Sequence, residues 1–125
     1  MRSAAIGLVI LLFPTPSTWA ASNVSPKFDG KYHGSVSPTP GMSRPECTPF
    51  QADLSATAGL IHRDAKVAVS FDGFITEEGF VHGHLRRPGQ APVLMEGRIT
   101  DTSLNAGAID DATGCAWVLN LERSP

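Results

Sequence analysis

Hydrophobic and polar residues alternate with a period of two along most of the chain after residue 27. The first such stretch covers residues 28–36, where apolar or small residues occupy every second position: Phe28, Gly30, Tyr32, Gly34 and Val36. Strict alternation is typical of a half-buried β-strand, because successive side chains of a strand point to opposite faces. We therefore predict a strand here with its apolar face turned toward a core.

Short segments of the same kind recur at regular spacing, and turn residues separate them. We predict further strands or strand pieces at residues 50–56, 60–61, 67–71, 74–76, 80–86, 92–100, 104–109 and 115–121. The connections are rich in Gly, Asp and Pro, as at Asp72-Gly73 and Glu77-Glu78-Gly79. No segment has the 3.6-residue periodicity of an amphipathic helix.

The predicted fold is all-β, a single small antiparallel meander or barrel of seven to eight short strands with one disulfide. Closure into a barrel would leave no exposed sheet edge. Glycines inside the predicted strands indicate tight bends or crowding at a barrel interior: Gly30, Gly34, Gly83 and Gly97. Residues 37–49 contain four prolines and a glycine, so we predict a long loop there.

Residues 1–20 have the three parts of a signal peptide. Arg2 supplies a positive start, residues 4–13 are apolar, and a small-residue region follows helix-breaking prolines. Ten apolar residues span about 15 Å as a helix, about half of a bilayer core. We predict cleavage after Ala20 and export to the periplasm or the extracellular space. A flexible leader at 21–27 and a single β-domain at 28–125 would follow.

The two cysteines, Cys47 and Cys115, both come after the predicted signal peptide. In an oxidising compartment an even pair is most simply a disulfide. Closing a loop of about 68 residues would stabilise the fold by roughly 4 kcal/mol on the chain-entropy model. Because the first cysteine is Cys47, no thiol stands at the cleavage point to carry a lipid. We expect no stable membrane anchor after cleavage.

Charge argues against nucleic acid as a partner. The whole chain has a formal net charge of −2, and loss of residues 1–20 removes one basic residue and none of the acids. The basic residues are scattered apart from Arg86-Arg87, whereas phosphate binding needs a concentrated positive surface. The expected partner is a small ligand or another exported protein.

Several elements together resemble a type of small exported bacterial β-domain protein of unknown function. They are the opening Phe28-Asp29-Gly30-x-Tyr32-x-Gly34, the Pro/Gly-rich loop leading to Cys47, and a closing strand with Cys115 and Trp117. This resemblance implies export and a β-meander or barrel, and no known activity. Gly30-Lys31-Tyr32 is also similar to the Gly-x-aromatic start of lipocalin-like and avidin-like barrels. Neither resemblance supplies site residues.

His82 and His84 are the sharpest chemical feature of the sequence. Residues i and i+2 of a strand share a face, so both imidazoles could reach one metal ion. Zinc would need at least a third ligand, and the available candidates are His33, His62, Asp72 and Glu96. Two solvent-facing histidines on a half-exposed strand are the simpler interpretation.

No catalytic motif stands out, and we expect neither an enzyme nor a cofactor. The Gly-x-Ser-x-Gly elbow of serine hydrolases is absent from the sequence, and both cysteines are expected to be oxidised. Tyr32 and Trp117 are either core residues or the floor of a pocket. The leading hypothesis is a non-enzymatic exported binding domain, with a ligand in the barrel mouth or on the 37–49 loop. The alternatives are an inhibitor or accessory factor for another exported protein, and a metal-dependent activity at His82 and His84.

Overall fold

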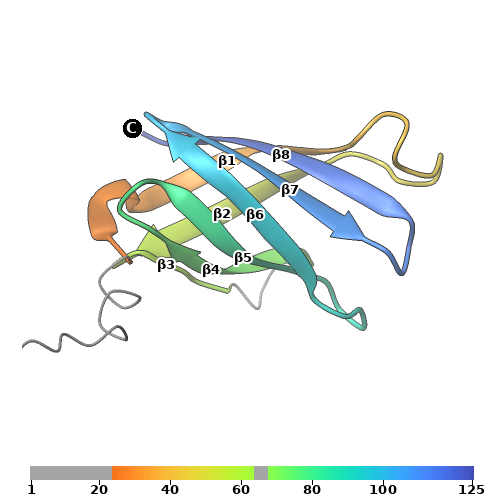
Figure 1. The fold of residues 1–125 in the computed structure, drawn as a ribbon, viewed down its shortest axis with the longest axis horizontal. Helices are drawn as coiled ribbons and strands as arrows, with labels where there is room; N and C mark the ends of the chain where they lie inside the picture. Colours follow the sequence, from red (N-terminus) through yellow and green to blue (C-terminus); the bar gives the residue numbers. More distant parts are fainter. Residues whose placement is uncertain (1–23, 64–67) are drawn as a thin grey trace, which may run out of the picture.

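The computed structural model describes residues 24–63 and 68–125, and these form a closed barrel of eight antiparallel strands (Figure 1). The elements in chain order are η2 (Pro26–Phe28), β1 (Gly30–Pro38), β2 (Phe50–Thr57), β3 (Leu60–Ile61), β4 (Ser70–Ile75), β5 (Phe80–Arg86), β6 (Val93–Thr100), β7 (Ser103–Asp110) and β8 (Cys115–Arg123). Each strand pairs with the next, and β8 pairs with β1. The predicted all-β fold is confirmed, and the sheet closes. The predicted signal peptide lies outside the described residues.

The number of paired residues between neighbouring strands varies around the barrel. Most neighbouring strands share six to eight residue pairs, and β7 with β8 has the longest register. Strand β3 has two residues and shares two pairs with each neighbour. Among the described residues, the pairing of β3 with β2 and β4 is therefore the shortest in the barrel.

The barrel interior is filled by the inward row of each strand. In β8 the predicted alternation holds, with Cys115, Trp117, Leu119 and Leu121 all buried. The largest fully buried side chains come from six different strands around the barrel: Tyr32, Val36, Phe71, Ile75, Val81, Leu85, Met95, Leu104, Leu119 and Leu121. Such a core drives folding through the burial of apolar surface.

The sequence prediction of a break at Asp72-Gly73 is wrong. Strand β4 runs through both residues, and Gly73 lies opposite Gly83 of β5. A Cβ atom on Gly73 would lie 2.1 Å from the carbonyl oxygen of His82, and one on Gly83 would lie 1.9 Å from that of Asp72. The two backbones approach so closely that only glycine fits at either position. The glycine that suggested a turn instead permits tight packing inside a strand pair.

The disulfide Cys47–Cys115 is confirmed, with an S–S distance of 2.06 Å. It joins the β1–β2 loop to the first residue of β8. The same loop makes further bonds to this strand: the Thr39 amide donates to the Ala116 carbonyl oxygen at 2.7 Å, and the Ser43 hydroxyl donates to the same oxygen at 2.8 Å. The proline-rich loop is thus fixed against one end of the barrel.

The opposite end is closed by the segment before β1. Val24 forms a bridge with Thr76, and the Ser25 amide donates to the Ile75 carbonyl oxygen at 3.0 Å. The described part of the predicted leader therefore contacts the barrel. The Tyr32 hydroxyl donates to the Phe28 carbonyl oxygen at 2.6 Å. Within the described ranges, no helix has the length and apolar character needed to cross a membrane.

Candidate functional site

The β1–β2, β5–β6 and β7–β8 connections gather at one end of the barrel, on the right in Figure 1. We call the hollow at this end the mouth. It has a volume of about 380 Å³ and is lined by Glu46, Cys47, Thr48, Phe50, Val69, Arg87, Thr113, Cys115 and Trp117. Both cysteines of the disulfide line the mouth, so the disulfide fixes the part of the β1–β2 loop that borders it.

Two lining residues each carry a buried hydrogen-bond donor that has no partner among the described residues: Trp117 Nε1 and Arg87 Nε. Trp117 is 5% exposed and belongs to the inward row of β8. A buried donor left unpaired costs about 1–3 kcal/mol, so nearly all such groups in proteins are paired. Both atoms are out of contact with solvent in this structure, although their residues line the mouth.

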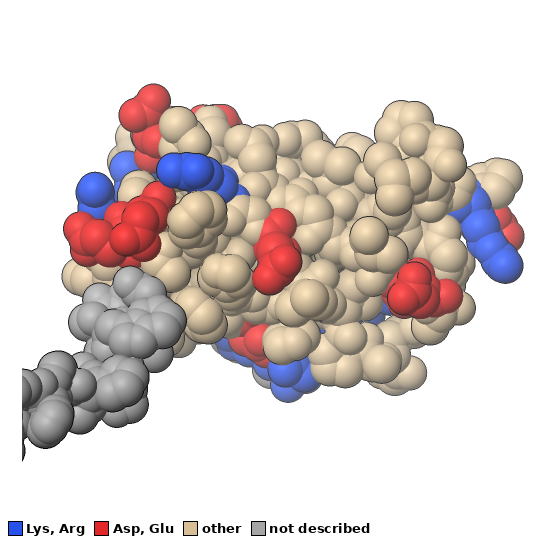
Figure 2. Space-filling model, viewed as in Figure 1, with Lys and Arg blue, Asp and Glu red and all other residues tan. Residues whose placement is uncertain are grey.

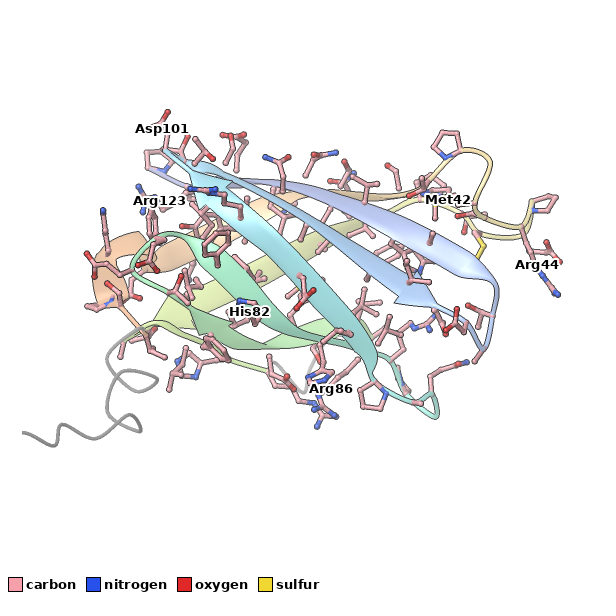
Figure 3. All side chains as sticks on the ribbon, viewed as in Figure 1. Met42, Arg44, His82, Arg86, Asp101 and Arg123 are labelled. Atoms are coloured by element: carbon pink, nitrogen blue, oxygen red, sulfur yellow. A yellow bond between two sulfur atoms is a disulfide. The ribbon has the colours of Figure 1, made fainter. Side chains whose placement is uncertain are left out.

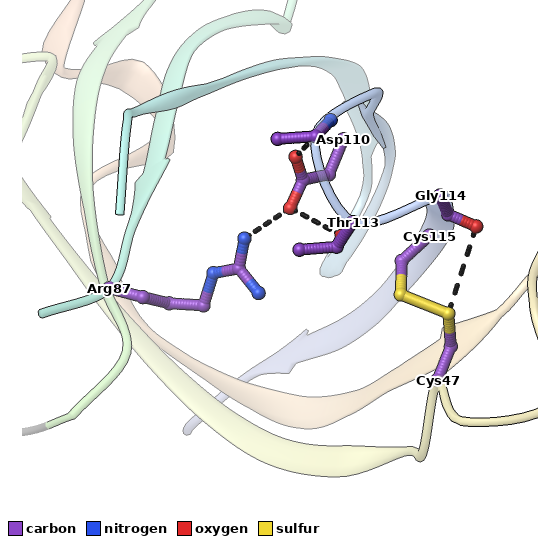
Figure 4. Close-up of polar contacts among 7 residues, drawn as sticks. Cys47, Arg87, Asp110, Thr113, Gly114 and Cys115 are labelled. Atoms are coloured by element: carbon purple, nitrogen blue, oxygen red, sulfur yellow. Dashed lines mark hydrogen bonds and ion pairs between the residues drawn. A yellow bond between two sulfur atoms is a disulfide. The ribbon is translucent and has the colours of Figure 1, made fainter. Parts of the chain in front are cut away.

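The rest of the Arg87 guanidinium is held by Asp110 (Figure 4). Its Nη2 donates to Asp110 Oδ2, and the same oxygen accepts from the Thr113 hydroxyl at 2.7 Å. The Ala112 amide donates to the other carboxylate oxygen at 3.1 Å. Arg87 is therefore fixed in position by an acid that is itself fixed by the β7–β8 turn.

Asp110 is ionised by the groups that surround it. Burial raises the pKa of this carboxyl, but the hydrogen bonds from Thr113 and Arg87, the Arg87 charge and the Ala112 amide together hold the pKa below its ordinary value of 3.8. The Asp110 side chain is 7% exposed. At neutral pH the pair is thus a carboxylate and a guanidinium that neutralise each other.

Aromatic and aliphatic side chains form the apolar part of the mouth. The Phe50 and Trp117 rings meet edge to face, with centroids 5.4 Å apart and planes inclined by 72°. Phe50 is the first residue of β2, and Val69 directly precedes β4. The mouth therefore combines an apolar wall with the fixed Arg87 guanidinium, which is the usual composition of a small-molecule site.

Sequence analysis singled out Tyr32 and Trp117 as core or pocket residues. Tyr32 is 1% exposed and bonds to Phe28 at the closed end. Trp117 lies at the mouth, so the barrel keeps the two residues apart. Sequence analysis did not single out Arg87 and Asp110 as a pair. Continuing the inward rows of β5 and β7 by one step would have placed both side chains inside.

His82 and His84 share the outer face of β5, as their spacing predicts, and each lies near one carboxylate (Figure 3). His82 Nδ1 is 3.3 Å from Glu96 Oε2, and His84 Nδ1 is 3.4 Å from Asp72 Oδ1. The His82 ring also stacks on Phe74, with centroids 5.3 Å apart. Residues 24–63 and 68–125 contain no group of three or more His, Cys, Asp or Glu side chains that could hold a metal ion.

The other two candidate ligands lie away from this row. His33 is on β1, where its Nδ1 is 2.6 Å from Asp53 Oδ1. His62 directly follows β3, and its amide donates to the Ser55 carbonyl oxygen at 3.0 Å. The interpretation of His82 and His84 as metal ligands stays a prediction.

A second hollow of about 500 Å³ lies on the outer wall over β6, β7 and β8, and we call it the outer groove. Gly107 and the exposed side chains of Met42, Leu94 and Ile109 are among its lining residues. Met42 comes from the β1–β2 loop (Figure 3). On the face seen in Figure 2, charged side chains gather toward the two ends of the barrel and along its lower edge, with isolated acidic ones between. The outer groove is larger than the mouth, and its exposed lining combines these apolar side chains with the acidic side chains of Glu96 and Asp111.

Comparison of the chain with family models, with curated proteins and with solved structures finds no match in any of the three.

Proposed function

We propose that the protein is an exported, non-enzymatic binding domain that holds a small ligand in the mouth of its barrel. The observation that carries this proposal is the hollow itself, about 380 Å³ in volume, in which Phe50 and Val69 form an apolar wall beside the Arg87 guanidinium that Asp110 fixes.

The ionisable groups of the mouth support binding rather than catalysis. A general acid or base must be available to exchange a proton with a substrate. Arg87 and Asp110 are instead bound to each other, and Asp110 also accepts bonds from Thr113 and Ala112. The two mouth cysteines are joined in a disulfide and have no thiol to act as a nucleophile.

The disulfide also supports export. Disulfides persist in oxidising compartments and are rare in a reducing cytosol. A signal peptide at residues 1–20 would deliver the chain to such a compartment, periplasmic or extracellular. There the Cys47–Cys115 bond would hold the β1–β2 loop in place and keep the mouth preorganised for its ligand.

Tryptophan fluorescence tests the proposal. The chain has two tryptophans, Trp19 and Trp117, so Trp19→Phe leaves the mouth residue as the sole emitter whether or not residues 1–20 are removed. Small-molecule extracts of the exported fraction should shift Trp117 emission in a saturable way and raise the melting temperature. Ile109→Ser in the outer groove is the control and should respond equally. Unchanged emission and an unchanged melting temperature with every extract would contradict the proposal.

A second candidate function is that of an accessory factor or inhibitor that docks on another exported protein. The outer groove favours it, because Thr39 and Met42 of the proline-rich loop line an apolar surface there. Its charged lining residues, Glu96 and Asp111, are both acidic. The partner surface that complements them is an apolar side chain flanked by Lys or Arg.

Binding measurements on a purified partner test this second function. Ile109→Asp should weaken the affinity of that partner at least about tenfold, because it places a charge in the apolar centre of the contact. His33→Ala, on the exposed face of β1, is the control and should leave the affinity unchanged. Equal affinities for both variants and the wild type would rule out the outer groove as the contact.

A further inference from the structure

Gly107, in the lining of the outer groove, is a glycine that the barrel itself does not require. The other glycines of the described ranges either have a positive φ or lie where a Cβ atom would collide with a neighbouring strand. Gly107 has neither feature, because its φ is not positive and a Cβ there would meet its nearest neighbour, the Trp117 carbonyl oxygen, at 3.8 Å. A glycine inside a strand lowers stability, and it often marks a place where a ligand approaches the backbone closely. The open space above Gly107 is therefore suited to a group from a partner.

The outer groove follows β7, which lies between β6 and β8 (Figure 1). Glu96 of β6 and Val118 of β8 are the register partners of Gly107. Ile109 is two residues further along β7 and 60% exposed, and Asp111 directly follows the strand. Since a strand rises about 3.3 Å per residue, the groove extends roughly 13 Å from Gly107 to Asp111.

The charges that line the outer groove are all negative. Glu96 and Asp111 are its charged lining residues, and the Glu96 side chain is 61% exposed. The neighbouring cations lie outside the lining: Arg98 lies over an aromatic ring of β5, and Arg44 lies against the β7–β8 turn. His82 is 3.3 Å from Glu96 and adds a positive charge only when it is protonated. With neutral histidine, the groove therefore presents a carboxylate near each end of an apolar surface.

We infer that the outer groove binds an extended segment of another exported protein with the pattern basic-x-apolar-x-basic, and this inference rests on the docking function proposed above. Residues i, i+2 and i+4 of an extended segment share a face and span roughly 13 Å, which matches the groove. The first basic side chain crosses the space above Gly107 to reach Glu96. The apolar side chain packs beside Met42 and Ile109, and the second basic side chain reaches Asp111.

A second copy of this chain does not supply such a segment. Its only two basic residues four positions apart are Lys27 and Lys31, and the residue midway between them is Asp29. The Asp29 carboxylate also accepts hydrogen bonds from the Ala58 and Gly59 amides at 2.7 and 2.9 Å, so it is already engaged in the fold. The partner is therefore a different protein.

Three short peptides with blocked ends test the inference. The first, Thr-Lys-Thr-Leu-Thr-Lys-Thr, has the inferred pattern, and the second, Thr-Lys-Leu-Thr-Thr-Lys-Thr, moves only the leucine to the opposite face. The third is the first with both lysines replaced by glutamate. Each is titrated into the isotope-labelled protein at about pH 8, where histidine is neutral. A proton–nitrogen correlation spectrum follows the amides of Gly107 and Ile109. We expect the first peptide to shift both amides saturably and to bind at least about fivefold more tightly than the second, and the third to give no saturable shift.

Gly107→Val gives a second reading, because it fills the space above β7 without changing a charge. It should bind the first peptide at least about fivefold more weakly, while its melting temperature does not fall, since valine suits a strand better than glycine. Glu96→Gln and Asp111→Asn should each weaken binding roughly threefold. Asp53→Asn is the matched control, because it removes a carboxylate from β2, four strands from β6 in the closed order, and it should bind as the wild type does. Wild-type affinity in a folded Gly107→Val would overturn the role of the space above the glycine.

The failures of the inference and of the docking function are distinguishable. Equal binding of the first and second peptides, with both amides shifted, would overturn the extended pattern and leave the outer groove as a docking site. Unchanged affinity in both Glu96→Gln and Asp111→Asn would overturn the basic character of the partner segment. If no peptide moves either amide up to its solubility limit, the inference is overturned, and the Ile109→Asp measurement on a purified partner then decides the docking function separately.

Discussion

At the scale of single residues, the Arg87–Asp110 pair holds the mouth together. Asp110 is nearly buried, and four hydrogen bonds or charges converge on it. Removing one member of a buried ion pair leaves the other charge uncompensated, which is usually more costly than the pair itself is stabilising. The pair therefore matters for both the stability of the barrel and the position of the Arg87 donor.

Asp110→Asn should lower the free energy of unfolding by about 3 kcal/mol at neutral pH. It should also change how the free energy of unfolding falls as the pH is lowered. Because the pKa of Asp110 is lowered in the folded state, its contribution is present above the ordinary value of 3.8 and is lost as the pH falls through the folded pKa. Chemical denaturation from neutral pH to about pH 3 measures both effects. Equal acid sensitivity of the variant and the wild type would contradict the role of Asp110.

The pKa of Tyr32 is raised rather than lowered, so its effect on stability appears at alkaline pH. Burial of the Tyr32 hydroxyl raises its pKa, and the nearby Asp29 charge raises it further. The Arg123 charge and hydrogen bond lower the pKa, but the net value lies above the ordinary 10.0. A raised pKa means that stability is full below that value and falls as the pH rises through the folded pKa. Since Tyr32 is the sole tyrosine, tyrosinate absorbance reports this group alone. Tyr32→Phe should lessen the alkaline loss of stability, and an identical alkaline limb would contradict the account.

At the scale of elements, strand glycines separate into two kinds, and the sequence alone could not tell them apart. Gly83 faces a neighbouring backbone so closely that a Cβ would collide with it, whereas a Cβ on Gly107 would meet its nearest neighbour at 3.8 Å. The difference depends on how the strands coil against one another. It therefore appears only when the register across both neighbours is known.

Gly83→Ala should destabilise the barrel by about 3 kcal/mol or more, because the Asp72 carbonyl group is backbone and has little room to move. Gly107→Ala is the matched control and should stay within about 0.5 kcal/mol of the wild type. Thermal unfolding followed by circular dichroism compares the two. Similar melting temperatures for both variants would show that the strands do not approach as closely at Gly83 as described.

Period-two patterning was sufficient to predict most of the strands. It located β1, β2 and β5 to β8 within a few residues, because each has one face in the core. It divided β4 at Asp72-Gly73, since a glycine after an aspartate also suits a turn. It suggested the barrel mouth as a ligand site but did not identify the Arg87–Asp110 pair there, because these two residues meet only once the strands are paired.

At the scale of the whole molecule, the disulfide constrains a loop of 68 residues, which is more than half of the chain. Loss of such a bond costs roughly 4 kcal/mol through the entropy of the unfolded chain. The double variant Cys47→Ala/Cys115→Ala should therefore melt at least about 15 °C below the wild type. A melting temperature within a few degrees of the wild type would show that the barrel does not depend on the bond.

The central proposal is that the barrel binds a small molecule at its mouth, and native mass spectrometry tests it most directly. The protein is purified from the exported fraction of its own source and sprayed without denaturant, beside the folded Arg87→Lys and Ile109→Ser variants. The account predicts an added small-molecule mass on the wild type and on Ile109→Ser, with lower occupancy on Arg87→Lys. Equal occupancy on all three proteins, or a bare chain in every sample and with every extract, would contradict it.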